Sequence, residues 1–186
     1  MGDRSGSDGN WNETLTLLVR NQASSKPGSR RRQSLAECPK MENLVPVSLN
    51  REALQRISMQ RRKEASTLLH AGLFPGAYYL MGYAVECALK ACVAKQTAKY
   101  DFPDKKRAQE SWTHNLNDLV RLAGLRQDLI SEMARSAELQ INWAIVKDWS
   151  ESDRYSINIT RLRAKALYTA CTNRRNGILS WIRQRW

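Results

Sequence analysis

The chain has 186 residues, enough for one folded domain and a tail, and its 42% hydrophobic and 26% charged residues are ordinary for a globular protein. Its 30 Lys and Arg against 18 Asp and Glu give a net charge of +12, which favours nucleic acid, nucleotides or an acidic protein as partners. Four cysteines without CxxC spacing and only two histidines argue against a structural zinc site, and we expect neither a metal nor a cofactor.

Residues 1–47 differ in composition from the rest of the chain. They are rich in Gly and Ser and contain three prolines and a run of three arginines, so we predict a disordered tail over 1–47 and a folded domain over 48–186. The first residues are polar, unlike a signal peptide. Three of the cysteines lie among apolar helical residues, where free thiols behave as small hydrophobes, which predicts a reducing, cytoplasmic location.

The first two predicted helices hold most of the apolar periodicity. Ser48–Asn50 offers N-cap residues for a helix that ends near Gly72. Phe74–Val93 then reads as a long helix that is apolar on almost every side, so other helices must cover it. Its length would allow a membrane span, but Glu86 and Lys90 inside it would be costly in hydrocarbon, and we predict no membrane role.

Shorter elements follow the central helix. Lys99–Ser111 is polar and reads as a loop, after which Thr113 would cap a short third helix that Gly124 ends. Leu125–Val146 has apolar residues at helical spacing and predicts a fourth helix.

The last predicted helix follows a loop over Asp148–Ile159. Thr160 would cap it, and Gly177 could break it locally. With no convincing strand, the pattern predicts an all-α fold, an antiparallel bundle of four long helices plus one short helix.

The central helix carries a polar stripe. Tyr79, Tyr83, Glu86 and Lys90 are spaced i, i+4, i+7 and i+11, which places them on one face. In one interpretation Glu86 and Lys90 form an ion pair while the tyrosines cap an edge of the core or a dimer seam. In the other, the tyrosines stack on a base and Glu86 orients Arg154 or contacts a ribose. A buried Glu86 would need Lys90 or Arg154 as a cationic partner.

The C-terminal segment is basic throughout. Between Arg154 and Trp186 there is no acidic residue. Eight basic residues lie there: Arg154, Arg161, Arg163, Lys165, Arg174, Arg175, Arg183 and Arg185. They could form a solvated helix face, but Arg161 and Arg163 near a helix start are disfavoured by the macrodipole, and a nearby anion would offset that cost.

Several tracts together resemble the HEPN family, named for higher eukaryotes and prokaryotes nucleotide-binding. In order, the matching tracts are AYYLMGYAVECALKAC (Ala77–Cys92), HNLNDLVRLAGL (His114–Leu125), WAIVKDW (Trp143–Trp149), RY (Arg154–Tyr155) and ILSWI (Ile178–Ile182). The resemblance implies an all-α bundle that commonly pairs into a dimer. Members of the family include ribonuclease toxins, partners of nucleotidyltransferases, and non-catalytic modules thought to bind nucleotides or RNA.

The catalytic members carry an Arg followed after four to six residues by a His near the start of the last helix. The matching arginine is Arg154, but Ile159, Thr160 and Arg161 stand where the His should be. RNA cleavage needs a group that titrates near neutral pH, and Tyr155 titrates too high to supply it unaided.

The main hypothesis is therefore a cytoplasmic, dimeric, non-catalytic HEPN-like module that binds a nucleotide, RNA or an acidic partner through a basic cleft between the central and last helices. One alternative is a metal-independent ribonuclease with a displaced catalytic set, and another is an interaction subunit of a toxin–antitoxin or nucleotidyltransferase pair. The candidate binding residues are Tyr79, Tyr83, Glu86, Lys90, Arg154, Tyr155 and Arg161, with His114 as a further candidate.

Three tryptophans and His114 are expected to have structural roles. Trp143, Trp149 and Trp181 are expected to anchor the core. His114 is expected near a helix start, packed against Trp112 or the neighbouring loop.

Overall fold

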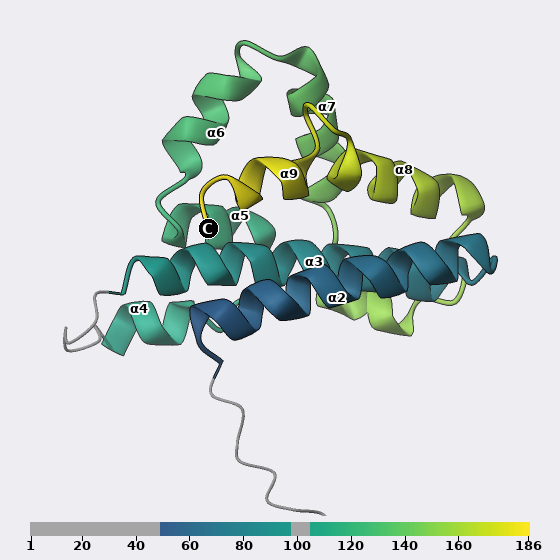
Figure 1. Cartoon of the computed structure of the whole chain (residues 1–186), viewed down its shortest axis with the longest axis horizontal. Helices are drawn as coiled ribbons and strands as arrows, with labels where there is room; N and C mark the ends of the chain where they lie inside the picture. The colour runs from purple at the N-terminus through teal and green to yellow at the C-terminus, as the bar shows by residue number, and fades with distance from the viewer. Residues whose placement is uncertain (1–48, 98–104) are drawn as a thin grey trace, which may run out of the picture. The chain divides into compact units, whose positions relative to one another are not determined.

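The computed structural model describes residues 49–97 and 105–186, which fall within one compact unit. This part of the chain contains eight α-helices, one 3-10 helix and no strand (Figure 1). The predicted all-α fold is confirmed. The tail predicted for residues 1–47 lies outside the described residues, as does the first part of the loop predicted over Lys99–Ser111.

The first two helices form a hairpin and lie side by side (Figure 1). Helix α2 (Arg51–His70) begins at the predicted cap, where the Asn50 side chain accepts a hydrogen bond from the Ala53 amide. The turn uses Gly72, whose φ of 77° is open to glycine at little cost. Helix α3 (Phe74–Lys95) follows, with a proline in its first turn.

Helix α3 is the centre of the described fold. It packs against α2, α5, α8, α9 and η1, and its residues are buried on most sides, as its apolar sequence predicts. No helix in residues 49–97 or 105–186 is both long and apolar enough to cross a membrane.

Two local predictions around the short helices are wrong. Helix α4 (Lys105–Glu110) lies in the predicted loop; it buries none of its residues, so no apolar stripe marks it in the sequence. Helix α5 (Leu116–Leu122) is capped by Asn115, which accepts from two amides, whereas Thr113 was the predicted cap. Gly124 ends this region as predicted, with a φ of 68°.

The predicted fourth helix is two helices. Helix α6 (Arg126–Met133) ends near Ala134, and α7 (Ala137–Val146) begins again after Ser136, whose hydroxyl accepts from the Leu139 amide. Three isoleucines of the segment predicted as one helix are exposed to solvent. These exposed residues are Ile130, Ile141 and Ile145.

The C-terminal third contains the 3-10 helix η1 (Glu151–Tyr155), α8 (Arg161–Thr172) and α9 (Ile178–Arg183). Thr160 caps α8 as predicted, accepting from the Arg163 amide. The helical conformation is interrupted before Gly177, as predicted from this glycine. The inner side of this region is apolar, and four of its residues are buried: Leu167, Cys171, Ile178 and Ile182.

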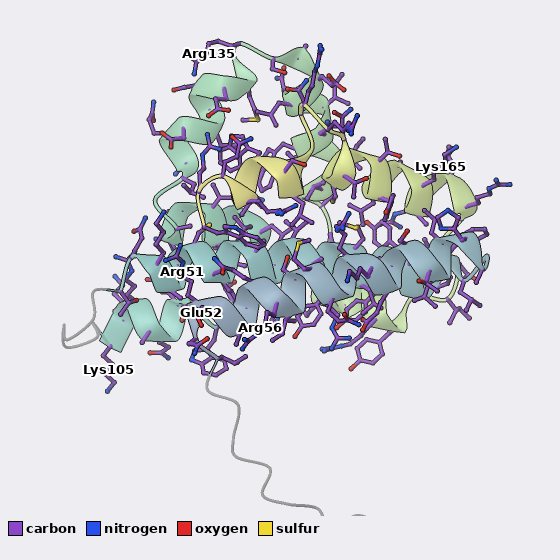
Figure 2. All side chains as sticks on the ribbon, in the orientation of Figure 1. Arg51, Glu52, Arg56, Lys105, Arg135 and Lys165 are labelled. Atoms are coloured by element: carbon purple, nitrogen blue, oxygen red, sulfur yellow. The ribbon has the colours of Figure 1, made fainter. Side chains whose placement is uncertain are left out.

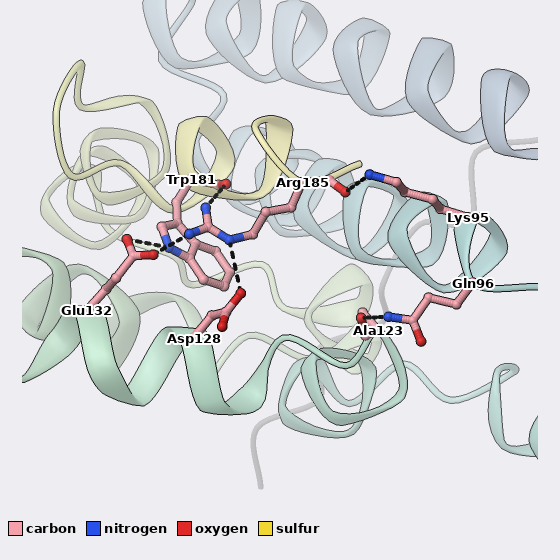
Figure 3. A network of polar contacts seen from close by, with 7 residues as sticks. All are labelled: Lys95, Gln96, Ala123, Asp128, Glu132, Trp181 and Arg185. Atoms are coloured by element: carbon pink, nitrogen blue, oxygen red, sulfur yellow. Dashed lines mark hydrogen bonds and ion pairs between the residues drawn. The ribbon is translucent and has the colours of Figure 1, made fainter.

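A polar network fastens α9 to α6 and α3 (Figure 3). The Arg185 guanidinium bonds to the Glu132 carboxylate, which also accepts from Trp181 Nε1 at 2.9 Å. Arg185 Nε lies 3.9 Å from Asp128, and its backbone carbonyl accepts from Lys95 Nζ at 3.0 Å. The last helix is therefore held in place, and with it the buried Trp181.

Candidate functional site

The candidate site is built around the carboxylate of Glu86, which is only 1% exposed in the middle of α3. Its Oε1 atom accepts from Lys90 Nζ at 2.9 Å and from His114 Nδ1 at 3.0 Å. The predicted partnership between Glu86 and Lys90 is present, one helical turn apart. The second partner is His114, whereas the other predicted cation, Arg154, lies exposed at the end of η1.

His114 is held in place by the residues around it. Asn115 caps α5, and Thr113 Oγ1 accepts from the Asn115 amide at 3.1 Å, so the short segment before α5 has a fixed conformation. A carboxylate can only accept, so the Nδ1 that faces Glu86 carries the proton. The other ring nitrogen is Nε2, and the His114 side chain is 44% exposed.

Trp149 completes the group that we call the Glu86 cluster: Glu86, Lys90, His114 and Trp149. The Trp149 ring is 3% exposed and lies against α3 at Gly82. A Cβ atom at that glycine would stand 2.2 Å from ring carbons, so only glycine admits the ring there. Trp149 Nε1 and Glu86 Oε2 are buried polar atoms with no hydrogen-bond partner in the described structure.

The two tyrosines of the predicted stripe are half-buried and already in contact with protein groups. The Tyr79 and Tyr83 rings are stacked at 6.1 Å with an interplanar angle of 11°. Trp149 lies 6.0 Å from the Tyr79 ring, and the Arg61 guanidinium lies 6.0 Å from that of Tyr83. Burial raises the pKa of Tyr83. Neighbouring groups therefore occupy ring surface that a stacking base would need.

A polar pocket of about 240 Å³ opens beside the Glu86 cluster. It lies between the segment before α5 and the segment that joins α7 to η1. Its lining residues are Thr113, His114, Asn115, Lys147, Trp149, Ser150 and Glu151. His114 and Lys147 supply nitrogen donors or cations, and Trp149 supplies a buried N–H.

Arg154 and Tyr155 end η1, whose first residue, Glu151, lines this pocket. The Arg154 guanidinium stands 5.0 Å from the Tyr155 ring, which is 76% exposed. The pKa of Glu151 is lowered, first by a hydrogen bond from its own backbone amide, then by the Ser150 hydroxyl and by the charges of His114 and Arg154. Arg154 and His114 therefore act on the same carboxylate from different elements.

The other two cations among the predicted binding residues, Arg161 and Lys90, lie elsewhere. Arg161 lines a separate pocket of about 420 Å³ between the end of α2 and the start of α8. Lys90 lines a third pocket, together with Leu54, Val93 and the exposed Trp112. Lys90, Arg154 and Arg161 were predicted as binding residues of one basic cleft, but the structure distributes them over three places.

Sequence reasoning named Arg163 only as a cation at a helix start that a nearby anion would favour, and it missed the contacts by which Arg163 holds the start of α8. Its guanidinium donates to the Tyr78 hydroxyl at 3.2 Å, lies 4.8 Å from that ring, and approaches Asp153 at 4.0 Å. It thereby connects α8 with α3 and η1. Lys147 and Glu151 at the pocket rim were also missed, because their sequence neighbours give no signal of proximity to His114.

The tryptophans behave as predicted, since Trp143, Trp149 and Trp181 are all buried. Within residues 49–97 and 105–186, no three His, Cys, Asp or Glu side chains gather as a metal-binding group. No family model, no curated protein and no solved structure matches the chain.

Proposed function

We propose that the chain is a non-catalytic HEPN-like module that binds a nucleotide or RNA at the polar pocket beside the Glu86 cluster. Arg154 would contact phosphate and Tyr155 would stack on a base, while His114 and Lys147 would donate to the ligand from inside the pocket. Helix α3 positions His114 through Glu86, and Arg163 of α8 approaches Asp153 of η1 at 4.0 Å.

The fold supports this proposal. A hairpin of two long helices, with α8 packed on the central one, is compatible with the four-helix antiparallel bundle that the resemblance implies. Dimer formation and a cytoplasmic location belong to the same proposal. The net charge of +12 favours a polyanionic ligand.

The observation that carries the proposal is the stacked pair of Arg154 and Tyr155 beside the pocket. Both side chains are exposed, and the pair combines a cation with a flat aromatic surface. Single-stranded nucleic acids are bound by such combinations, because the cation meets the phosphates while the ring stacks on a base. The half-buried Tyr79 and Tyr83 offer less free ring surface, so Tyr155 is the better stacking residue.

Fluorescence polarisation with labelled single-stranded RNA and labelled ATP tests the proposal on the full-length protein. We expect binding that Arg154→Ala and Tyr155→Ala each weaken by about tenfold, the range of one lost base stack or charged contact. Arg174→Ala is the matched control, since it removes the same charge from the exposed turn after α8. No binding, or equal loss in Arg174→Ala, would reject this site.

A ribonuclease is the second candidate function, and the contact between Glu86 and His114 favours it. The carboxylate fixes the His114 proton at Nδ1, so Nε2 can take the proton of an RNA 2′-hydroxyl. The 2′-oxygen would then attack phosphorus, the bond to the 5′-oxygen would break, and that oxygen would take a proton from water. Arg154 would stabilise the charge on the phosphoryl oxygens.

Incubating the same RNA with the protein in the presence of EDTA, followed by gel electrophoresis, separates the two functions. Products that end in a cyclic phosphate, and that disappear in His114→Ala and in Glu86→Gln, would establish the ribonuclease. His70→Ala is the control, because His70 bonds the Ser66 carbonyl at the end of α2, away from Glu86. Binding without cleavage would leave the non-catalytic module.

A further inference from the structure

Large apolar side chains are open to solvent at the start of α8, in the segment before it and in the turn before α3. Ile157 is 83% exposed, Leu162 is 80% exposed and Leu73 is 55% exposed. Leu73 lies in the turn between α2 and α3, and the start of α8 shares a pocket with the residues on either side of it. We call Leu73, Ile157, Leu162, Arg161 and Lys165 the α8-start surface.

The helix itself shows that Leu162 points outward. Its buried residues Ala164, Leu167 and Cys171 form the inner face at i, i+3 and i+7, and Leu162 lies roughly on the opposite side. Leu162 therefore contributes little to the core. Single exposed apolar residues are common, but a group of them at one end of a helix marks an interaction site.

Cations surround these apolar side chains. Arg161 and Lys165 are one turn apart on α8, and with His70 they line the hollow of about 420 Å³ between α2 and α8. Figure 2 shows Lys165 on the outer side of α8. None of the described residues that line this hollow is acidic, and Leu69 and Phe74 give it an apolar wall.

We propose that the α8-start surface binds an acidic, amphipathic segment of a partner protein. Apolar side chains of the segment would cover Leu73, Ile157 and Leu162, and its carboxylates would pair with Arg161 and Lys165. This inference is independent of nucleotide binding at Arg154 and Tyr155, since it uses other side chains.

Other occupants match the surface less well. In a symmetric dimer the same patch would meet itself, which would bring the Arg161 and Lys165 side chains of two copies together. Nucleic acid would meet the cations but would leave exposed leucine and isoleucine side chains against phosphates. A lipid surface would suit protruding side chains but would not fill the hollow lined by Leu69 and Phe74.

Selection from a displayed library of short random peptides on the full-length protein tests the inference. We expect enriched peptides that combine Asp or Glu with two or more large apolar residues. Their binding should weaken by about tenfold or more in Leu162→Ser and in Arg161→Gln, as for residues at the centre of an interface. Thr169→Ser, on the exposed side of the same helix, is the matched control and should leave binding unchanged.

Four outcomes would overturn the inference. The first is a selection that enriches no peptides, or only peptides that bind Leu162→Ser and the parent protein equally well. The other three are activities that Leu162→Ser abolishes: formation of a concentration-dependent dimer in sedimentation, binding to phosphatidylglycerol vesicles, or binding to RNA. Leu162→Ser should melt at the temperature of the parent protein, and Ile157→Ser provides an independent second variant.

Discussion

The Glu86 cluster and the α8-start surface both depart from the usual distribution of side chains, in opposite directions. In the cluster a carboxylate that is 1% exposed lies inside the core, where it pairs with the Lys90 ammonium and accepts a hydrogen bond from His114. At the α8-start surface, Leu162 and Ile157 are more than three-quarters exposed, and nothing in the described part of the chain covers them. The first departure is balanced within the chain and orients His114, whereas we propose that a partner covers the second.

The largest expected difference between the interior and the surface is in the rate at which cysteine thiols react with a thiol reagent. Burial raises the pKa of Cys87 and of Cys92 to about 11, and that of Cys171 further, so at about pH 8 only about a thousandth or less of each is thiolate. In a Cys38→Ser background we expect no reaction with a thiol reagent until the protein unfolds.

A cysteine introduced at the α8-start surface provides the contrast. Leu162→Cys in the same background should react within minutes, because position 162 is 80% exposed. Equal rates for the introduced and the native thiols would contradict the burial of the core.

Gly82→Ala should cause the largest loss of stability. The new methyl group would overlap the buried Trp149 ring, so we expect a loss of about 3 kcal/mol in the free energy of unfolding, at the upper end for overpacking. Urea denaturation measures it. Gly76→Ala is the control in the same helix, since its Cβ would meet only the flexible end of Leu68, at 3.0 Å; a similar loss there would refute the argument.

Glu86→Gln should have a smaller but clear effect. The substitution keeps the side-chain volume but removes the negative charge of the carboxylate that contacts Lys90 and His114. We expect the free energy of unfolding to fall by about 2 kcal/mol, which is less than for a fully buried pair because both partners reach solvent. Glu64→Gln breaks a more exposed pair with Arg61 and should cost about 0.5 kcal/mol or less. Equal losses in urea denaturation would show that the burial of Glu86 has no energetic consequence.

Leu162→Ser should have the smallest effect on folding. An 80% exposed side chain contributes little to the core, so the free energy of unfolding should stay within about 0.5 kcal/mol of the parent protein. A loss comparable to that of Gly82→Ala would mean that Leu162 is part of the core, and the α8-start surface would lose its main apolar residue.

Much of the fold could be predicted because caps and breakers act locally. Asn50, Thr160 and Gly124 mark helix ends in the structure as they do in the sequence. The break at Ser136 was missed because apolar residues continue at helical spacing across it, from Leu129 to Ile141.

The site was predictable only where its residues share a helix. The pairing of Glu86 with Lys90 follows from their i, i+4 spacing. The contact of Glu86 with His114 joins two segments 28 residues apart, and no local pattern encodes it. The close packing of the Trp149 ring against Gly82 could not be predicted from the sequence either, because only the folded chain brings the two residues together.

The salt dependence of RNA affinity in the parent protein and in Arg154→Ala tests the central claim most directly. Measured between about 50 mM and about 200 mM salt, log affinity should fall steeply in the parent protein, and the slope should be smaller by about one in Arg154→Ala. Arg174→Ala should leave the slope closer to that of the parent protein. Affinity that is insensitive to salt, or identical slopes in parent and Arg154→Ala, would contradict phosphate binding at this site.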